Sequence, residues 1–116
     1  MSTKPRMSAE TLRIVGAMLE DPAAEHYGLR LAETAGIPSG TVYPILARLQ
    51  KAGWLESRWE EQSAEDEGRP RRRLYRLTGP GERAAMSELD EIVRVARRAK
   101  QRRRQRMRLK PGERLV

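Results

Sequence analysis

The segment from residue 39 to residue 51 combines hydroxyl and cationic side chains with small residues near its start. Such groups donate hydrogen bonds to phosphate oxygens and to base edges, and proteins use them widely against nucleic acids. No carboxylate follows residue 39 until Glu56, so the segment itself does not repel a phosphate. The pattern predicts a segment that lies in a groove of DNA. The candidate DNA-binding residues are Ser39, Gly40, Thr41, Tyr43, Pro44, Arg48 and Lys51.

The apolar residues of this segment have the spacing of a helix that packs on a core. They are Val42, Ile45, Leu46 and Leu49, at i, i+3, i+4 and i+7. We expect Thr41 to cap the helix, which places Pro44 in the first turn, where its missing N–H has no intrahelical partner anyway. The free N–H groups at the head of the helix, with Gly40 beside them, allow a phosphate to approach. Gly53 ends the helix.

Two shorter helices are predicted before this one. Ser8 is the expected cap of a helix that ends near Glu20, and Asp21-Pro22 stops it. A second helix begins at about Glu25 and ends at Gly36, where a left-handed cap is easiest. The second and third helices, joined by a turn that contains glycine, form a helix-turn-helix candidate.

Residues 54–59 and 72–78 have partial alternation and aromatic content, which predict the two strands of a hairpin. The limb leading into its tip is acidic, and the limb leading out carries Arg69, Arg71 and Arg72. These arginines contact DNA, or they pair in solvent with the acidic limb. Trp54 is expected in the core, whereas Trp59 either completes the core or contacts a small-molecule effector.

A long helix is predicted from about Glu82 to somewhere beyond Ala99, after the breakers of residues 78–81. Its apolar residues alternate four and three apart, as in a coiled coil, and a small domain cannot bury so long a stripe alone. We therefore expect a homodimer. The dimerisation residues are Ala85, Leu89, Ile92, Val93 and Ala96 of this helix, with Leu12, Val15 and Leu19 of the first helix.

The positive charge of the chain is concentrated near its C-terminus. The net charge is +8, and nine of the 24 basic residues lie in residues 97–110, which leaves 15 basic against 16 acidic residues elsewhere. Because these charges repel one another, we expect the helix to fray after Ala99 and residues 100–116 to form a mobile basic tail. That tail adds non-specific affinity for DNA, or it is a solvated end without a role.

Other functional classes are disfavoured by composition. The chain of 116 residues has room for one domain and has no cysteine for a disulfide or a thiolate site. His26, the single histidine, forms too small a set with Glu25 and Glu33 to hold a metal, and it serves no evident nucleophile. The uncharged runs are too short to span a bilayer, and the start lacks a signal-peptide pattern. We expect a cytoplasmic protein with no catalytic residues, cofactor, metal or membrane contact.

Three segments carry a family resemblance: HYGLRLAE, PSGTVYPILARLQKAGWLESRWEE and RPRRRLYRLTGPGERA. Over about residues 10–85 they are similar to the PadR family of transcriptional regulators. The resemblance implies a winged helix-turn-helix of the short form, mainly α with a two-stranded β wing. It divides the chain into a DNA-binding domain over 8–80, a C-terminal dimerisation helix over 81–99 and the basic tail over 100–116.

The resemblance also implies a function. A homodimeric repressor would bind a near-palindromic operator in double-stranded DNA and leave it when a small-molecule effector binds. It implies a contact of the Tyr43 hydroxyl with phosphate, which the position of Tyr43 opposite the apolar stripe also favours; the alternative is that Tyr43 packs on the second helix. The alternative is an adaptor that holds a protein partner with the winged helix and binds RNA through the Arg-rich tail.

Overall fold

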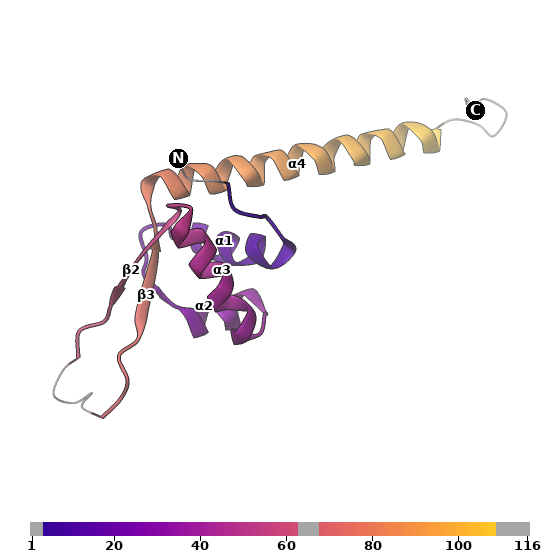
Figure 1. The fold of residues 1–116 in the computed structure, drawn as a ribbon. Helices are drawn as coiled ribbons and strands as arrows, with labels where there is room; N and C mark the ends of the chain where they lie inside the picture. Colours follow the sequence, from indigo (N-terminus) through magenta and orange to yellow (C-terminus); the bar gives the residue numbers. More distant parts are fainter. Residues whose placement is uncertain (1–3, 63–67, 109–116) are drawn as a thin grey trace. The chain divides into compact units, whose positions relative to one another are not determined.

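The structure is a computed structural model, and it describes residues 4–62 and 68–108. Its elements, in chain order, are α1 (Ala9–Leu19), β1 (His26–Tyr27), α2 (Gly28–Ala35), α3 (Ser39–Lys51), β2 (Leu55–Trp59), β3 (Arg73–Leu77) and α4 (Gly79–Arg108) (Figure 1). The chain divides into one unit over 1–86 and another over 87–116, and α4 begins in the first and continues in the second. None of the helices within the described ranges has the length and apolar character needed to cross a membrane.

Helices α1 and α2 are bounded by the expected caps. The Ser8 hydroxyl accepts a hydrogen bond from the Thr11 N–H at 3.2 Å, and Gly36 ends α2 with a φ of 68°. Helix α1 buries Ile14 and Val15 completely. Helix α2 begins at residue 28 instead of 25 because the two residues before it form a strand.

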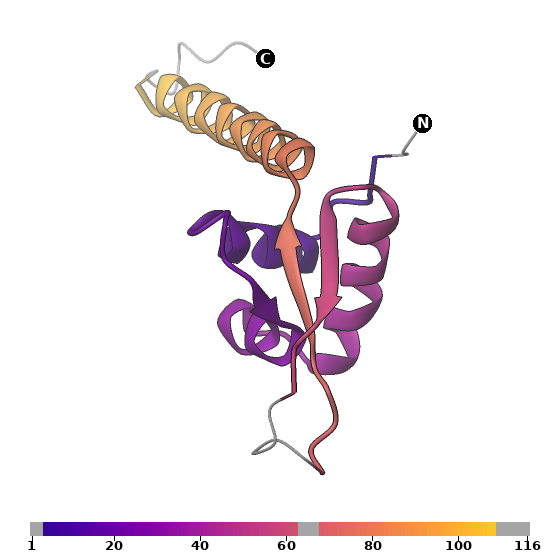
Figure 2. The ribbon, with the colours of Figure 1, turned by 90° about the vertical axis from the view of Figure 1, so that its left-hand side faces the viewer.

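The predicted hairpin is confirmed, and β1 adds a third antiparallel strand to it in the order β1-β3-β2 (Figure 2). In this sheet Tyr27 pairs with Leu74, and Trp59 pairs with Arg73. The expected two-stranded wing is therefore part of a three-stranded sheet. A strand of two residues is too short to show alternation, so the sequence pattern does not reveal β1.

Helix α3 starts three residues earlier than predicted, with Pro38 instead of Thr41 as its N-cap. The carbonyl oxygen of Pro38 accepts hydrogen bonds from the N–H groups of Thr41 and Val42 at 3.0 and 3.2 Å, so the first turn forms on Pro38. Thr41 is thus inside the helix, and Pro44 lies in its second turn, where the missing N–H cannot bond to the carbonyl oxygen of Gly40. The expectation that Thr41 caps the helix is wrong.

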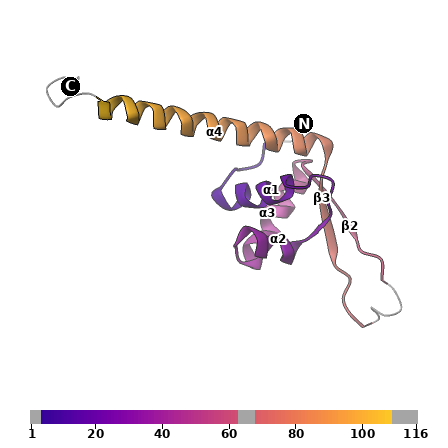
Figure 3. The same cartoon turned by 180° about the vertical axis from the view of Figure 1, so that it is seen from behind.

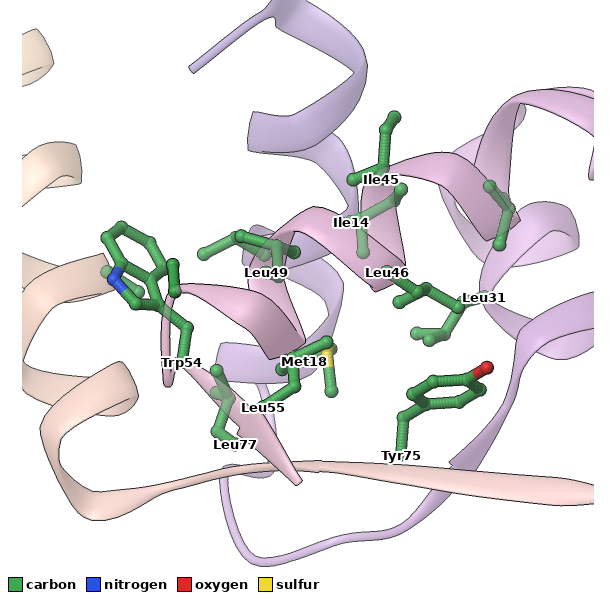
Figure 4. Packing of buried hydrophobic residues seen from close by; sticks show 14 of the residues in the cluster. Ile14, Met18, Leu31, Ile45, Leu46, Leu49, Trp54, Leu55, Tyr75 and Leu77 are labelled. Atoms are coloured by element: carbon green, nitrogen blue, oxygen red, sulfur yellow. The ribbon is translucent and has the colours of Figure 1, made fainter. Parts of the chain in front are cut away.

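The four apolar residues predicted to face the core from α3 are buried, with exposed fractions between 0 and 2%. Side chains from α1, α2 and the sheet meet them, as Figure 4 shows for Ile14, Leu31 and Tyr75. Trp54, which follows α3, is 7% exposed and packs at the edge of this core, as expected. The core therefore holds α3 by one side and leaves its other side to solvent.

The junction of β3 and α4 is closed by Thr78. Its N–H donates to the carbonyl oxygen of Trp54 at 2.9 Å, its hydroxyl donates to that of Gly53 at 2.7 Å, and the hydroxyl accepts from the Gly81 N–H at 2.9 Å. A Cβ atom at Gly81 would lie 2.0 Å from the Trp54 carbonyl oxygen. Only glycine allows this close approach of two backbone segments.

Helix α4 continues to Arg108, so the expected fraying after Ala99 is wrong for residues 100–108, and the rest of the predicted tail lies outside the described residues (Figure 3). Residues 97–108 are almost all arginine, lysine, glutamine or alanine, which are good helix formers, and no glycine or proline interrupts them. Local preference thus extends the helix into the basic segment.

Replacing Gly81 by alanine tests the close junction. Gly81→Ala should lower the free energy of unfolding by about 1–3 kcal/mol, because the added methyl group must displace backbone atoms. Gly16→Ala is the control, since a Cβ atom there meets nothing within 4 Å and should raise helix stability by up to about 1 kcal/mol. Chemical denaturation measures both, and a Gly81→Ala protein as stable as the wild type would contradict the packing described.

Candidate nucleic-acid interface

The outward side of α3 carries the residues that the sequence selects for DNA. Six of the seven are exposed and Thr41 is half-buried; the exposed ones are Ser39, Gly40, Tyr43, Pro44, Arg48 and Lys51. The N–H groups of Ser39 and Gly40 precede the first hydrogen-bonded N–H of the helix, that of Thr41. The helix therefore presents free backbone donors at its head and cations farther along.

Tyr43 lies against the start of α2. A Cβ atom at Gly28 would be 2.6 Å from Cε1 of the Tyr43 ring, so the ring fits only because residue 28 has no side chain. The tyrosine still keeps 45% of its surface exposed. Tyr43 therefore packs on the second helix, which is one of the two interpretations of this residue. Because part of the side chain stays exposed, its contact with a phosphate remains a prediction.

The wing sorts its charges by face. On the side that continues the core, Trp59 is 52% exposed and the Arg73 guanidinium lies 4.6 Å from its ring centroid. On the opposite side Arg76 pairs with Glu56, and Arg58 pairs with Glu25 through contacts of 2.6 and 2.9 Å. The hydrogen bonds from Arg58 lower the pKa of Glu25. The second side is largely neutralised by its own acids.

The carboxylate of Glu60 ties the base of the wing together, and we call it the wing hub. Tyr27 donates its hydroxyl to Oε2 at 2.9 Å, and Arg72 donates its backbone N–H and its Nε to Oε1 at 3.1 and 3.2 Å. Arg69 approaches Oε1 at 3.2 Å. The Arg72 guanidinium also stacks 3.9 Å from the Tyr27 ring centroid. Glu60 is only 8% exposed, so a buried charge here is matched by several donors.

Burial raises the pKa of Glu60, but the hydrogen bonds from Tyr27 and Arg72 outweigh burial and hold the pKa below its ordinary value of 4.5. The folded protein therefore favours the ionised carboxylate. Its contribution to stability is present above the unfolded pKa and is lost as the pH falls through the lower folded pKa.

The three wing arginines selected from the sequence separate in the structure. Arg69 and Arg72 contact Glu60, as the interpretation of pairing with acids predicts. Arg71 is exposed and makes no ion pair among residues 4–62 and 68–108. Arg73 is not among the residues selected from the sequence, although alternation from the buried Tyr75 and Leu77 places it on the side of α3. Arg71 and Arg73 are therefore the wing cations left for a ligand.

A cleft of about 1210 Å³ lies between these elements. Its wall includes Tyr27, Tyr43, Trp59, Arg71 and Arg73. The acidic residues of the wall are Glu20, Asp21 and Glu25, between α1 and β1, and Glu33 of α2. Trp59, the residue proposed for effector contact, lines this cleft. In the described part of the chain no group of three or more histidine or acidic residues is arranged to hold a metal ion.

The residues selected for dimerisation fall into two sets. Val15 and Ala85 are completely buried in the core of the first unit, so neither side chain can contact a second subunit directly. The others keep exposed surface: Leu12, Leu19 and Leu89 are half-buried, and Ile92, Val93 and Ala96 are exposed. The apolar spacing along a helix does not show which of its residues pack on the core of the same chain and which stay exposed for a second subunit.

Glu60→Gln tests the wing hub. The variant should melt several degrees below the wild type near neutral pH, because the amide cannot accept as many charged hydrogen bonds as the carboxylate. The difference should shrink as the pH falls below 4.5, where the unfolded chain begins to bind the proton, and it should be lost below the lower pKa of the folded carboxylate. Glu61→Gln, at an exposed position, is the control. Thermal melts at several pH values measure it, and a constant difference would refute the ionised hub.

The fold and this surface define a winged helix-turn-helix protein. The sequence profile of the Transcriptional regulator PadR-like family matches residues 19–87, which is more than half of the chain. The chain belongs to this family, whose members are transcriptional regulators and not enzymes. None of the curated protein sequences compared with the chain matches it significantly.

Solved structures share the fold. A PadR family transcriptional regulator from Eggerthella lenta is 25% identical with a TM-score of 0.63, over 79% of this chain and 82% of that one. A PadR family regulator from Clostridium difficile is 23% identical with a TM-score of 0.66, over 81% and 97%. Bacillus subtilis PadR in complex with operator DNA is 18% identical with a TM-score of 0.58, over 71% of this chain and 47% of that one.

Proposed function

We propose that the protein is a cytoplasmic, sequence-specific regulator that binds double-stranded DNA as a homodimer, as a ligand-responsive repressor on a near-palindromic operator. The observation that carries the proposal is the outward side of α3, which combines free N–H groups, hydroxyls and cations without a carboxylate. The relative from Bacillus subtilis, solved with operator DNA, supports the same use of this fold.

The side chains have separate tasks in this proposal. Ser39, Thr41 and Arg48 read base edges in the major groove. Tyr43, Lys51 and the unpaired wing arginines hold phosphates, and they set the register of the helix without reading sequence. Arg69 and Arg72 act through Glu60 to hold the wing in shape. In a dimer the two half-site centres lie roughly one helical turn of DNA apart.

The effector part of the proposal concerns the cleft beside α3. Trp59 offers a half-exposed ring there, and Tyr27 and Tyr43 add flat surfaces that suit an aromatic compound. A compound bound there would act by favouring a geometry in which the two copies of α3 no longer match the operator. Screening aromatic compounds in the operator-binding assay tests this part, and a screen without any release of DNA would argue for a constitutive binder.

Gel-shift titrations with the DNA upstream of the protein's own gene test the function. Sequence-specific binding should survive deletion of residues 100–116, since α3 and the wing remain. Loss of all nucleic-acid binding on that deletion would favour the adaptor. In the full chain, the double variant Arg71→Gln, Arg73→Gln should make log K depend less steeply on log salt, by about 0.9 for each phosphate that the variant no longer neutralises.

Arg76→Gln is the matched control for this pair of substitutions. Arg76 lies on β3 three residues from Arg73, but it pairs with Glu56 on the other side of the sheet. Its loss should leave the salt dependence unchanged. Equal effects of the double variant and the control would remove the wing from the DNA interface.

The dimer is proposed to form through the exposed apolar stripe of α4. Val93→Lys should raise the dimer dissociation constant about tenfold or more, because it removes an aliphatic side chain that the proposed interface would bury and places a charge there. Val95→Lys is the control, since Val95 is 57% exposed but points away from the stripe of Leu89, Ile92 and Val93. Sedimentation equilibrium measures both constants. A dimer that tolerates Val93→Lys as well as Val95→Lys would exclude this stripe.

A further inference from the structure

The end of α4, residues 97–108, is a basic segment that the operator-binding surface does not use. Eight of its twelve residues are arginine or lysine: Arg97, Arg98, Lys100, Arg102, Arg103, Arg104, Arg106 and Arg108. All twelve residues are exposed. The chain has no carboxylate between Glu91 and Glu113, so no acid stands one helical turn away from any of these cations.

The charges of the basic segment oppose one another along the helix. Arg98 and Arg102, Lys100 and Arg104, and Arg102 and Arg106 are all four residues apart, where like charges face each other and weaken a helix. The unit over 87–116 has no buried side chain among its described residues that could offset this repulsion. An external polyanion would remove the repulsion and stabilise the helix.

The composition of the basic segment selects among polyanions. Its only apolar side chains are Ala99 and Met107, so it has no apolar face to insert into a lipid surface. It has no aromatic residue on which an unpaired base could stack, which disfavours single-stranded nucleic acid. The basic residues occur on every side of the helix, as suits a helix flanked by phosphates in a wide groove.

We propose that the basic segment binds the phosphates of duplex DNA without regard to sequence. Twelve helical residues span about 18 Å, and the major groove of B-DNA is about 12 Å wide, so the helix can enter it. Arginine and lysine neutralise the phosphates and release counterions. This binding does not depend on operator recognition, because it uses no residue of α3 or of the wing.

The experiment compares the full chain with the triple variant Arg102→Gln, Arg103→Gln, Arg106→Gln on a random-sequence duplex, by fluorescence anisotropy across salt concentrations. Glutamine keeps the helix preference of arginine, and circular dichroism checks it. If all three residues contact phosphates, the salt slope should fall by about 2.7. When the salt concentration rises from about 50 to about 200 mM, the factor by which affinity falls should then be about forty times smaller for the variant than for the wild type.

The control is the triple variant Arg13→Gln, Arg83→Gln, Arg94→Gln, which changes the net charge equally at exposed positions of α1 and α4. It should keep the wild-type slope, with size-exclusion chromatography confirming the same oligomeric state for all proteins. A wild-type slope in the Arg102 variant would overturn the proposal. Tighter binding to duplex RNA or to phosphatidylserine vesicles, abolished in that variant, would overturn the assignment to DNA.

The same variants separate this proposal from the proposed regulator. The Arg102 variant should weaken operator and random duplex by the same factor, so that the preference for the operator persists. A protein with no operator at all, but with a salt slope that depends on Arg102, Arg103 and Arg106, would count against the regulator and for the basic segment.

Discussion

Helix α3 is held entirely by its apolar side. Val42, Leu46 and Leu49 are completely buried, and each turn of the helix contributes to the same core. Rotating the helix would expose these side chains to water, at a cost of roughly 1.5–3 kcal/mol for each one. The direction in which its hydroxyl and cationic residues point is therefore set by hydrophobic packing, and the position of Tyr43 on Gly28 follows from it.

The wing depends on a different kind of interaction. A nearly buried carboxylate must find donors, and Glu60 finds them in Tyr27 of β1 and in Arg69 and Arg72, which precede β3. Two wing arginines that were candidates for DNA contact, Arg69 and Arg72, therefore pair with Glu60 instead. What remains for a ligand is the pair on the other side, Arg71 and Arg73. The number of cations in a wing is thus a poor guide to the number that can meet a phosphate.

The proposed roles divide affinity from specificity. The first unit carries hydroxyls and a few unpaired cations, which suit recognition of bases and positioning on a particular site. The end of α4 carries charge without side chains suited to reading bases, which suits sequence-independent attraction and fast association with long DNA. A nearly neutral body with a basic helix end would hold a regulator near DNA while α3 selects the site.

Some features of the structure can be predicted because their causes are local. The Ser8 cap, the left-handed Gly36 and the apolar spacing of α3 act within a few residues, and all three are confirmed. The predicted start of α3 is three residues late because both Pro38 and Thr41 can begin a helix. The expected fraying of α4 after Ala99 does not occur in residues 100–108 because helix preference outweighs charge repulsion there.

Neighbouring residues alone specify the helices, the hairpin and the apolar side of α3, since periodicity and caps act over a few positions. Which charges are free depends instead on contacts between distant segments. Tyr27 and Glu60 are 33 residues apart, and they meet because β1 joins the sheet beside β3. The burial of Val15 and Ala85 has the same origin. Contacts between residues far apart in the sequence depend on which segments fold against each other. The spacing of neighbouring residues does not predict these contacts.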